Sequence, residues 1–244
     1  MEDPLVTAVM ITGKHQDRIP LALASIAAFQ GQTYPDKQLL ILNTGQTRLT
    51  DELNPIPNVF ETFAPHWCFT ALGLLRNHAL DIIADRFSPD AWVIQWDDDD
   101  WHHPHRIAMQ VYTARENEFR YPVTLRNQIR YSFETNSGFE HKAQEAAWGI
   151  HGTVLHPQTD LRYEQVPKHE DSRFLKLFKR VDICENMPQL YIRFVHGRNT
   201  FNEQHIMRHL AGKRDVWDMS PEAKTYLADV LNLHYIPQLA GSGA

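Results

Sequence analysis

Cysteine, long apolar runs and excess positive charge are all scarce in this sequence. Two cysteines among 244 residues, Cys68 and Cys184, provide neither a disulfide framework nor a four-ligand zinc site. No apolar run approaches membrane-spanning length, and no charged-then-apolar leader opens the chain. A formal net charge of −6 argues against a general nucleic-acid coat, which needs a basic face. We therefore expect a cytoplasmic protein, with peripheral contact at a membrane left open for its last helix.

The order of apolar patterns indicates an α/β domain. Continuous apolar runs at Leu5–Ile11 and Gln38–Leu42 predict buried parallel strands, and Pro20–Phe29 has the spacing of the helix between them. Such an order implies a right-handed crossover and a mostly parallel central sheet flanked by helices. An amphipathic pattern within Pro221–Leu239 predicts a small C-terminal helical appendage. Further predicted elements are strands at Val59–Phe63, Pro122–Phe133 and Gln189–Val195, and helices at Ala71–Ala84 and Pro104–Glu116.

The stretch Ala91-Trp-Val-Ile-Gln-Trp-Asp-Asp-Asp-Asp100 stands out because a strand-like apolar run ends in four consecutive acids. Open α/β sheets bind ligands at the carboxyl ends of their strands, where these acids fall. In an extended segment Asp97 and Asp99 would face one side, and Asp98 and Asp100 the other. An Asp-x-Asp pair suits Mg²⁺ or Mn²⁺, and a nucleotide diphosphate would complete the ion's shell. Taken alone, the stretch also fits a solvated turn.

Two further acids, Glu170 and Asp171, stand at a predicted helix start. There they fit a helix cap that complements the helix dipole, and equally a general base acting on an acceptor hydroxyl. Trp148 lies beside a glycine and fits either a sugar-stacking platform or core packing.

Two basic side chains have the same ambiguity. Arg76, on a predicted helix, fits phosphate binding or a surface position over the core. His196 follows a predicted strand and fits a metal ligand or a structural histidine. The histidines beside the acids, His102, His103 and His105, match no usual zinc spacing.

Several ordered blocks between Val6 and about Asn202 together resemble the family 2 glycosyltransferases of GT-A fold. The blocks, each weak alone, are Gln32-Thr-Tyr-Pro-Asp36, the helix segment Leu72-Gly-Leu-Leu-Arg-Asn77, Trp96–Pro104 with its acids, His169-Glu-Asp171 and Tyr191–Thr200, which contains His196-Gly-Arg-Asn-Thr200. The chain departs from the family pattern after its first two strands. It has Thr12-Gly-Lys-His15 and Leu42-Asn-Thr-Gly-Gln46 where the family commonly has other residues, among them an aspartate pair that helps to read the base.

The resemblance implies a role for each matching residue. Asp99 would bind the metal directly, with His196 as a further ligand and Asp97 holding the metal shell or the ribose. Asp171, beside Glu170, would be the catalytic base of a single inverting displacement. Residues implied near the sugar nucleotide are Thr12, Asn43, Thr44, Arg76 and Asp98, and Trp148 is a candidate for the acceptor site.

Together these features predict an inverting, metal-dependent hexosyltransferase-type glycosyltransferase. Its cofactor would be Mn²⁺ or Mg²⁺, its donor a nucleotide-diphosphate sugar, by default a UDP-sugar, and its acceptor a glycan, lipid-linked or polysaccharide hydroxyl. Two alternatives remain: a phage-type enzyme acting on a hydroxylated DNA base, which the net charge disfavours, and an inactive GT-A-like binding module. We expect a transferase domain at 1–205, with a nucleotide-sugar half to about 105 and an acceptor half from about 106, and a helical tail at 206–244.

Overall fold

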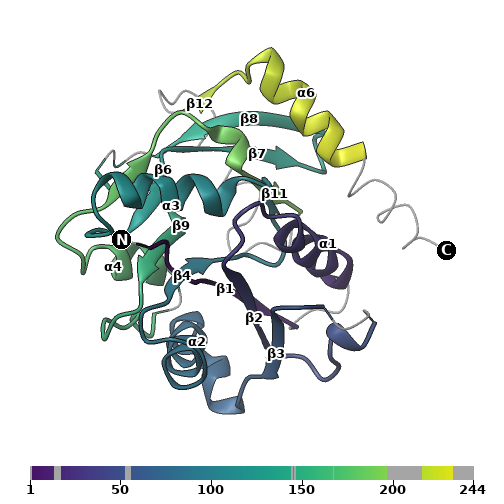
Figure 1. Cartoon of the computed structure of the whole chain (residues 1–244). Helices are drawn as coiled ribbons and strands as arrows, with labels where there is room; N and C mark the ends of the chain where they lie inside the picture. The colour runs from purple at the N-terminus through teal and green to yellow at the C-terminus, as the bar shows by residue number, and fades with distance from the viewer. Residues whose placement is uncertain are drawn as a thin grey trace.

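The computed structural model contains two β-sheets with helices packed against them (Figure 1). It describes residues 2–13, 18–52, 56–143, 145, 147–166, 168–196 and 216–232. Within these ranges, no helix combines the length and the apolar character that crossing a membrane requires.

The larger sheet has seven strands in the order β10-β6-β9-β4-β1-β2-β3. The first four strands along the chain, β1 to β4, are parallel and lie in the order β3-β2-β1-β4, and β9 runs antiparallel to both of its neighbours. This confirms the prediction of a mostly parallel central sheet. The strands are β1 Val6–Thr12, β2 Lys37–Asn43, β3 Val59–Phe63, β4 Trp92–Gln95, β6 Val123–Leu125, β9 Ile150–Pro157 and β10 Asp182–Cys184.

Helices cover both faces of this sheet, which explains why strands β1 and β2 are mostly apolar on both faces. Alternate residues of β1 face opposite sides: Ala8 and Met10 join a core with α1 and α3, whereas Val9 joins a second core with α2. The helices are α1 Ile19–Gln30, α2 Leu72–Arg86, α3 Arg106–Glu116 and the short α4 Glu170–Leu175, with 3₁₀ turns at Thr50–Glu52, His66–Thr70 and Pro188–Leu190.

The smaller sheet has five strands in the order β12-β8-β7-β11-β5. Its strands are β5 Trp101–His102, β7 Asn127–Ser132, β8 Ser137–Lys142, β11 Tyr191–Val195 and β12 Val216–Trp217. Helix α6, Pro221–Val230, lies along this sheet (Figure 1), and its Leu227 and Val230 are buried in the main core. The described part of the predicted tail therefore packs on the domain, while residues 206–215 and 233–244 lie outside the described residues.

The four acids do not continue strand β4 as the alternation rule assumed. The strand ends at Gln95, and Asp98 and Asp99 lie in a turn before β5 begins at Trp101. The predicted pairing of Asp97 with Asp99 on one side and Asp98 with Asp100 on the other is therefore wrong. A turn rotates successive side chains through angles other than the 180° of an extended strand.

Helix α2 is joined to the loop at residues 163–164 by two features of the segment Gly73-Leu-Leu-Arg-Asn77. A Cβ at Gly73 would lie 2.2 Å from the Glu164 carbonyl oxygen, so only glycine permits this approach. The Asn77 side chain donates to the Tyr163 carbonyl oxygen at 2.9 Å and accepts from the Tyr163 N–H at 2.8 Å. These contacts fix the helix that carries Arg76.

Replacing Asn77 by alanine should lower the free energy of unfolding by about 1 to 3 kcal/mol, because two backbone groups of Tyr163 lose their partner. Urea unfolding measures the change. The control is Asp85→Ala on an exposed position of the same helix, which should change stability by less than about 0.5 kcal/mol. Equal effects of the two variants would contradict the role assigned to Asn77.

Candidate active site

Three parallel strands end at the same edge of the larger sheet and place the predicted site residues there. Strand β1 ends at Thr12, β2 ends at Asn43, and Asp97 follows the end of β4. In this order β1 lies between β2 and β4, and open sheets bind ligands in the crevice at such carboxyl ends. A side-chain hydrogen bond between Thr12 and Asp98 joins the ends of β1 and β4.

The four acids separate into two pairs according to their partners. The Tyr191 hydroxyl, on β11, contacts Asp97 Oδ2 at 2.9 Å and also Asp100 Oδ2. The Arg18 guanidinium, just before α1, contacts Asp98 Oδ1 and lies 2.8 Å from Asp99 Oδ2. All four carboxyl groups are thus held by residues distant in the sequence.

Burial and mutual repulsion act against ionisation of these acids. Burial and the charge of Asp99 raise the pKa of Asp98 to about 7, and burial with the same neighbour raises the pKa of Asp100 well above its usual range. Asp99 differs: burial raises its pKa, but a hydrogen bond with His196 and the charge of Arg18 outweigh burial and lower it overall. Asp99 is therefore better held as an anion than Asp98 or Asp100.

Two predicted metal ligands, Asp99 and His196, lie together. The Nε2 atom of His196 is 3.0 Å from Asp99 Oδ2, and both side chains are largely buried. Strand β11 makes this possible, because it pairs with β5 directly after the acids and ends at Val195.

The residues fit a divalent ion that takes few protein ligands. Adjacent ligands of an octahedral ion with bonds of about 2.1 Å lie about 3 Å apart, as the Asp99 and His196 atoms do. Within the described ranges, no three His, Cys, Asp or Glu side chains form a site alone, so phosphate oxygens and water would supply the remaining ligands. An imidazole ligand favours a transition-metal ion such as Mn²⁺ over Mg²⁺.

The two acids at the start of α4 have different surroundings. Glu170 is buried, and its Oε1 lies 3.4 Å from Nε of Arg76, which is itself buried and packs over the Tyr163 ring. Asp171 Oδ1 accepts from the Ser172 N–H at 2.7 Å and from the Ser172 hydroxyl at 3.3 Å. No donor in the described part of the chain reaches Asp171 Oδ2, which leaves that oxygen available to a ligand.

Asp97 and Asp171 approach each other over strand β9. A Cβ built on Gly152 would lie 3.9 Å from Oδ2 of each carboxyl group and 3.4 Å from Nε2 of Gln95. That amide group also donates to Asp97 Oδ1 at 3.2 Å. Two carboxyl groups from distant segments thus face one small region of the sheet surface.

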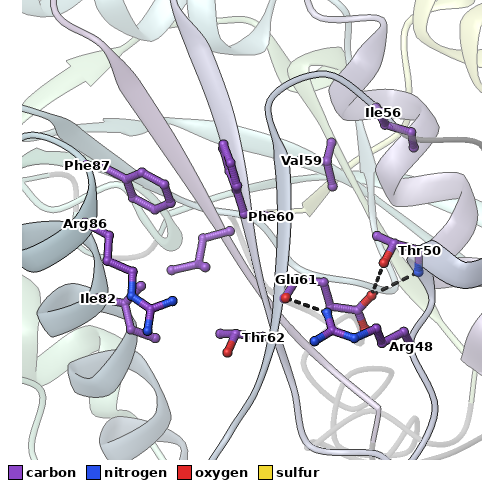
Figure 2. A pocket seen from close by; sticks show the side chains of 11 residues that line it. Arg48, Thr50, Ile56, Val59, Phe60, Glu61, Thr62, Ile82, Arg86 and Phe87 are labelled. Carbon is purple, nitrogen blue, oxygen red and sulfur yellow. Dashed lines mark hydrogen bonds between the residues drawn. The ribbon is translucent and has the colours of Figure 1, made fainter.

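The loop after β2 is held by its own hydrogen bonds. Asn43 donates to the Thr47 carbonyl oxygen at 2.8 Å and to Glu61 Oε1 at 2.5 Å, and the Thr44 hydroxyl donates to the Thr12 carbonyl oxygen at 2.8 Å. Glu61 also accepts from the Leu49 N–H. Figure 2 shows that it accepts from Thr50 as well. The polar side-chain atoms of Asn43 and Thr44 are thus engaged within the protein, and their role in reading a base stays a prediction.

The cavity in Figure 2 lies around the edge strand β3 and has a volume of about 620 Å³. Its lining includes Arg48, Phe60, Glu61, Arg86 and Phe87, and none of the predicted site residues. It is therefore separate from the acid cluster.

Trp148 packs against an apolar cluster of Val154, Leu175 and Val181, and its carbonyl oxygen accepts from Thr124. This packing matches the structural alternative for Trp148, and its acceptor role stays a prediction. Gly197–Thr200, from the last block of the family resemblance, lie outside the described residues.

Sequence reasoning missed Tyr191, Arg18 and Arg193, which hold the acid turn. Burial lowers the pKa of Arg193, but the charges of Asp100, Tyr191 and Asp97 outweigh burial and raise it overall. Four adjacent acids require cations and hydrogen-bond donors as partners, and this requirement can be seen in the sequence. The spacing of residues could not identify which segments provide those partners.

Known proteins resemble this chain in structure only: no protein-family model matches the sequence, and no curated protein matches it. Among solved structures, S. aureus TarS has a TM-score of 0.55 at 15% identity, over 95% of this chain and 43% of TarS. TarS 1–349 in complex with UDP-GlcNAc has a TM-score of 0.58 at 14% identity, over 93% of this chain and 66% of that TarS chain. The complex of TarS 1–349 with UDP has a TM-score of 0.55 at 15% identity, over 94% of this chain and 71% of that TarS chain. This chain therefore spans less than half of the full TarS chain and has the mixed α/β fold of the TarS glycosyltransferase.

Proposed function

We propose that this protein is an inverting, metal-dependent glycosyltransferase of family 2 type that transfers a sugar from a nucleotide-diphosphate sugar to a hydroxyl group. The observation that carries the proposal is the approach of Asp97 and Asp171 over Gly152, beside the Asp99 and His196 pair. One carboxyl group would bind the donor and the other would serve the acceptor. The glycosyltransferase fold supports this reading of the site.

Asp171 is the general base in this proposal. Its Oδ1 is fixed by Ser172, whereas its Oδ2 has no donor among the described residues and lies 3.9 Å from a Cβ built on Gly152, as Asp97 Oδ2 does. Oδ2 takes the proton of the acceptor hydroxyl as the oxygen bonds to the anomeric carbon. The bond from that carbon to the phosphate oxygen breaks on the opposite side, the electron pair leaves with the diphosphate, and the configuration inverts.

Glu170 and Arg76 support this step as a buried ion pair. Glu170 cannot serve as the base while it faces Arg76 at 3.4 Å, so its proposed role is to position the arginine. Arg76 also interacts electrostatically with Asp97 and Asp171, and thereby offsets their mutual repulsion.

Asp99 and His196 would hold the divalent ion, with Asp97 and Asp98 beside it. When bound, such an ion neutralises charge that develops on the departing diphosphate. The TarS complexes with UDP-GlcNAc and UDP support a uridine nucleotide as the default donor. The acceptor class remains the predicted glycan, lipid-linked or polysaccharide hydroxyl.

A panel of UDP-, GDP-, dTDP- and CMP-sugars tests the function directly. Nucleotide release should occur from one donor in the presence of Mn²⁺ and stop when EDTA is added. Activity without metal would contradict the metal requirement. Release from no donor, together with an unchanged melting temperature for every nucleoside diphosphate tested, would contradict the transferase proposal and favour a binding module.

Replacing Asp171 by asparagine should reduce nucleotide release from the preferred donor by 10²- to 10⁴-fold, the usual contribution of a general base. The thermal unfolding midpoint should remain close to that of the parent protein. The control is Glu164→Gln, an exposed acid on a surface ion pair, which should retain activity. Near-normal release by the Asp171 variant would show that another group removes the proton.

Removing either proposed ligand should change the metal dependence of the reaction. His196→Ala should raise the Mn²⁺ concentration for half-maximal activity by about 10- to 100-fold, and Asp99→Asn should do so at least as strongly. The matched control is His105→Ala, because His105 is an exposed histidine bonded to Thr33. An unchanged Mn²⁺ titration for His196→Ala would remove it from the ligand set.

A further inference from the structure

Neither the backbone conformation nor the packing of strand β9 requires a glycine at position 152. The φ of Gly152 lies outside the left-handed region, unlike those of Gly13 and Gly149. An added Cβ would find no atom closer than 3.4 Å, which is ordinary contact, whereas at Gly73 it would meet backbone at 2.2 Å. The backbone and its packing therefore tolerate an alanine at 152.

The atoms around Gly152 are nevertheless those of the reaction site. Asp97 Oδ2, Asp171 Oδ2 and Gln95 Nε2 are its nearest neighbours. The antiparallel register of β4 and β9 pairs Ile94, near the carboxyl end of β4, with Leu155, three residues after Gly152. Although β9 lies inside the sheet between β6 and β4, Gly152 remains partly exposed.

We infer that Gly152 is a specificity-determining residue that leaves room for the ring of the transferred sugar between Asp97 and Asp171. The inference rests on the proposed glycosyltransferase function. Sugar hydroxyl groups donate hydrogen bonds to carboxylates, so a ring lying over Gly152 meets acceptors on two sides. A methyl group at this position makes only ordinary contacts with the two acids, at 3.9 Å, and it should hinder the sugar while leaving nucleotide binding unchanged.

Two substitutions of increasing size test the inference on the whole chain. Gly152→Ala should lower kcat for nucleotide release from the preferred donor at least 10-fold, and Gly152→Val at least 100-fold. The rise in melting temperature caused by the bare nucleoside diphosphate with Mn²⁺ should stay within 1.5-fold of the parent value for both variants.

The matched control is Gly31→Ala at the end of α1. Gly31 likewise has a conventional φ and only ordinary contacts around an added Cβ, at 3.6 and 3.8 Å. It stands at the opposite end of α1 from Arg18, which contacts the acids. Its activity and nucleotide response should match those of the parent.

Two results would overturn the inference while leaving the function intact. Parent-like release by Gly152→Val would show that no sugar occupies this space. A loss of release accompanied by an equal loss of the nucleoside diphosphate response would show that residue 152 acts through the fold of the site. Failure of the parent protein itself to release nucleotide from any donor would overturn the proposed function, and the inference with it.

Discussion

The site depends on cations and hydrogen-bond donors that offset the cost of burying four consecutive carboxyl groups inside a folded domain. Asp98, Asp99 and Asp100 are each less than a tenth exposed, and charges buried without partners would not be tolerated at this density. The fold supplies Arg18 from the start of α1 and Tyr191 from β11, which contact two acids each. The turn that carries the acids is thus defined by one side chain from β11 in the smaller sheet and one from the start of α1, a helix that packs on the larger sheet. Its geometry therefore requires both parts of the domain to be in place.

This requirement gives the smaller sheet a function beyond packing. Strand β11 pairs with β5, which directly follows the acids, and brings Tyr191 and Arg193 to Asp100 and His196 to Asp99. The backbone N–H of Phe194 also donates to Asp100 Oδ1 at 2.9 Å. Four residues of one strand and its end, Tyr191, Arg193, Phe194 and His196, therefore set the orientation of the acid turn. The larger sheet alone would present Asp97 at a strand end without fixing the three acids that follow it.

The sequence was sufficient to predict the alternating strands and helices, because the periodicity of apolar residues directly reflects whether an element is buried on one face or on two. The family resemblance also assigned Asp99 and His196 to one metal site, and these two side chains lie together. It named Asp171 as the base without pairing it with Asp97. Sequence reasoning failed at the acid turn, where a rule for extended strands was applied to residues that are not extended. The sequence could not indicate a role for Arg18, because its contact with Asp98 joins residues 80 positions apart in the chain. It could not indicate one for Gly152 either, because no local pattern shows which side chains from other segments surround that position.

Arg18 also bears on how metal and donor would bind together. The same atom, Asp99 Oδ2, lies 2.8 Å from Arg18 and 3.0 Å from His196, so a divalent ion at this oxygen would add positive charge beside a guanidinium group. Such crowding of cations costs free energy in a partly desolvated site. A nucleotide diphosphate carries the negative charge that offsets both cations. Under the proposed function, metal and donor should therefore bind with positive coupling, because each lowers the electrostatic cost that the other meets beside Arg18.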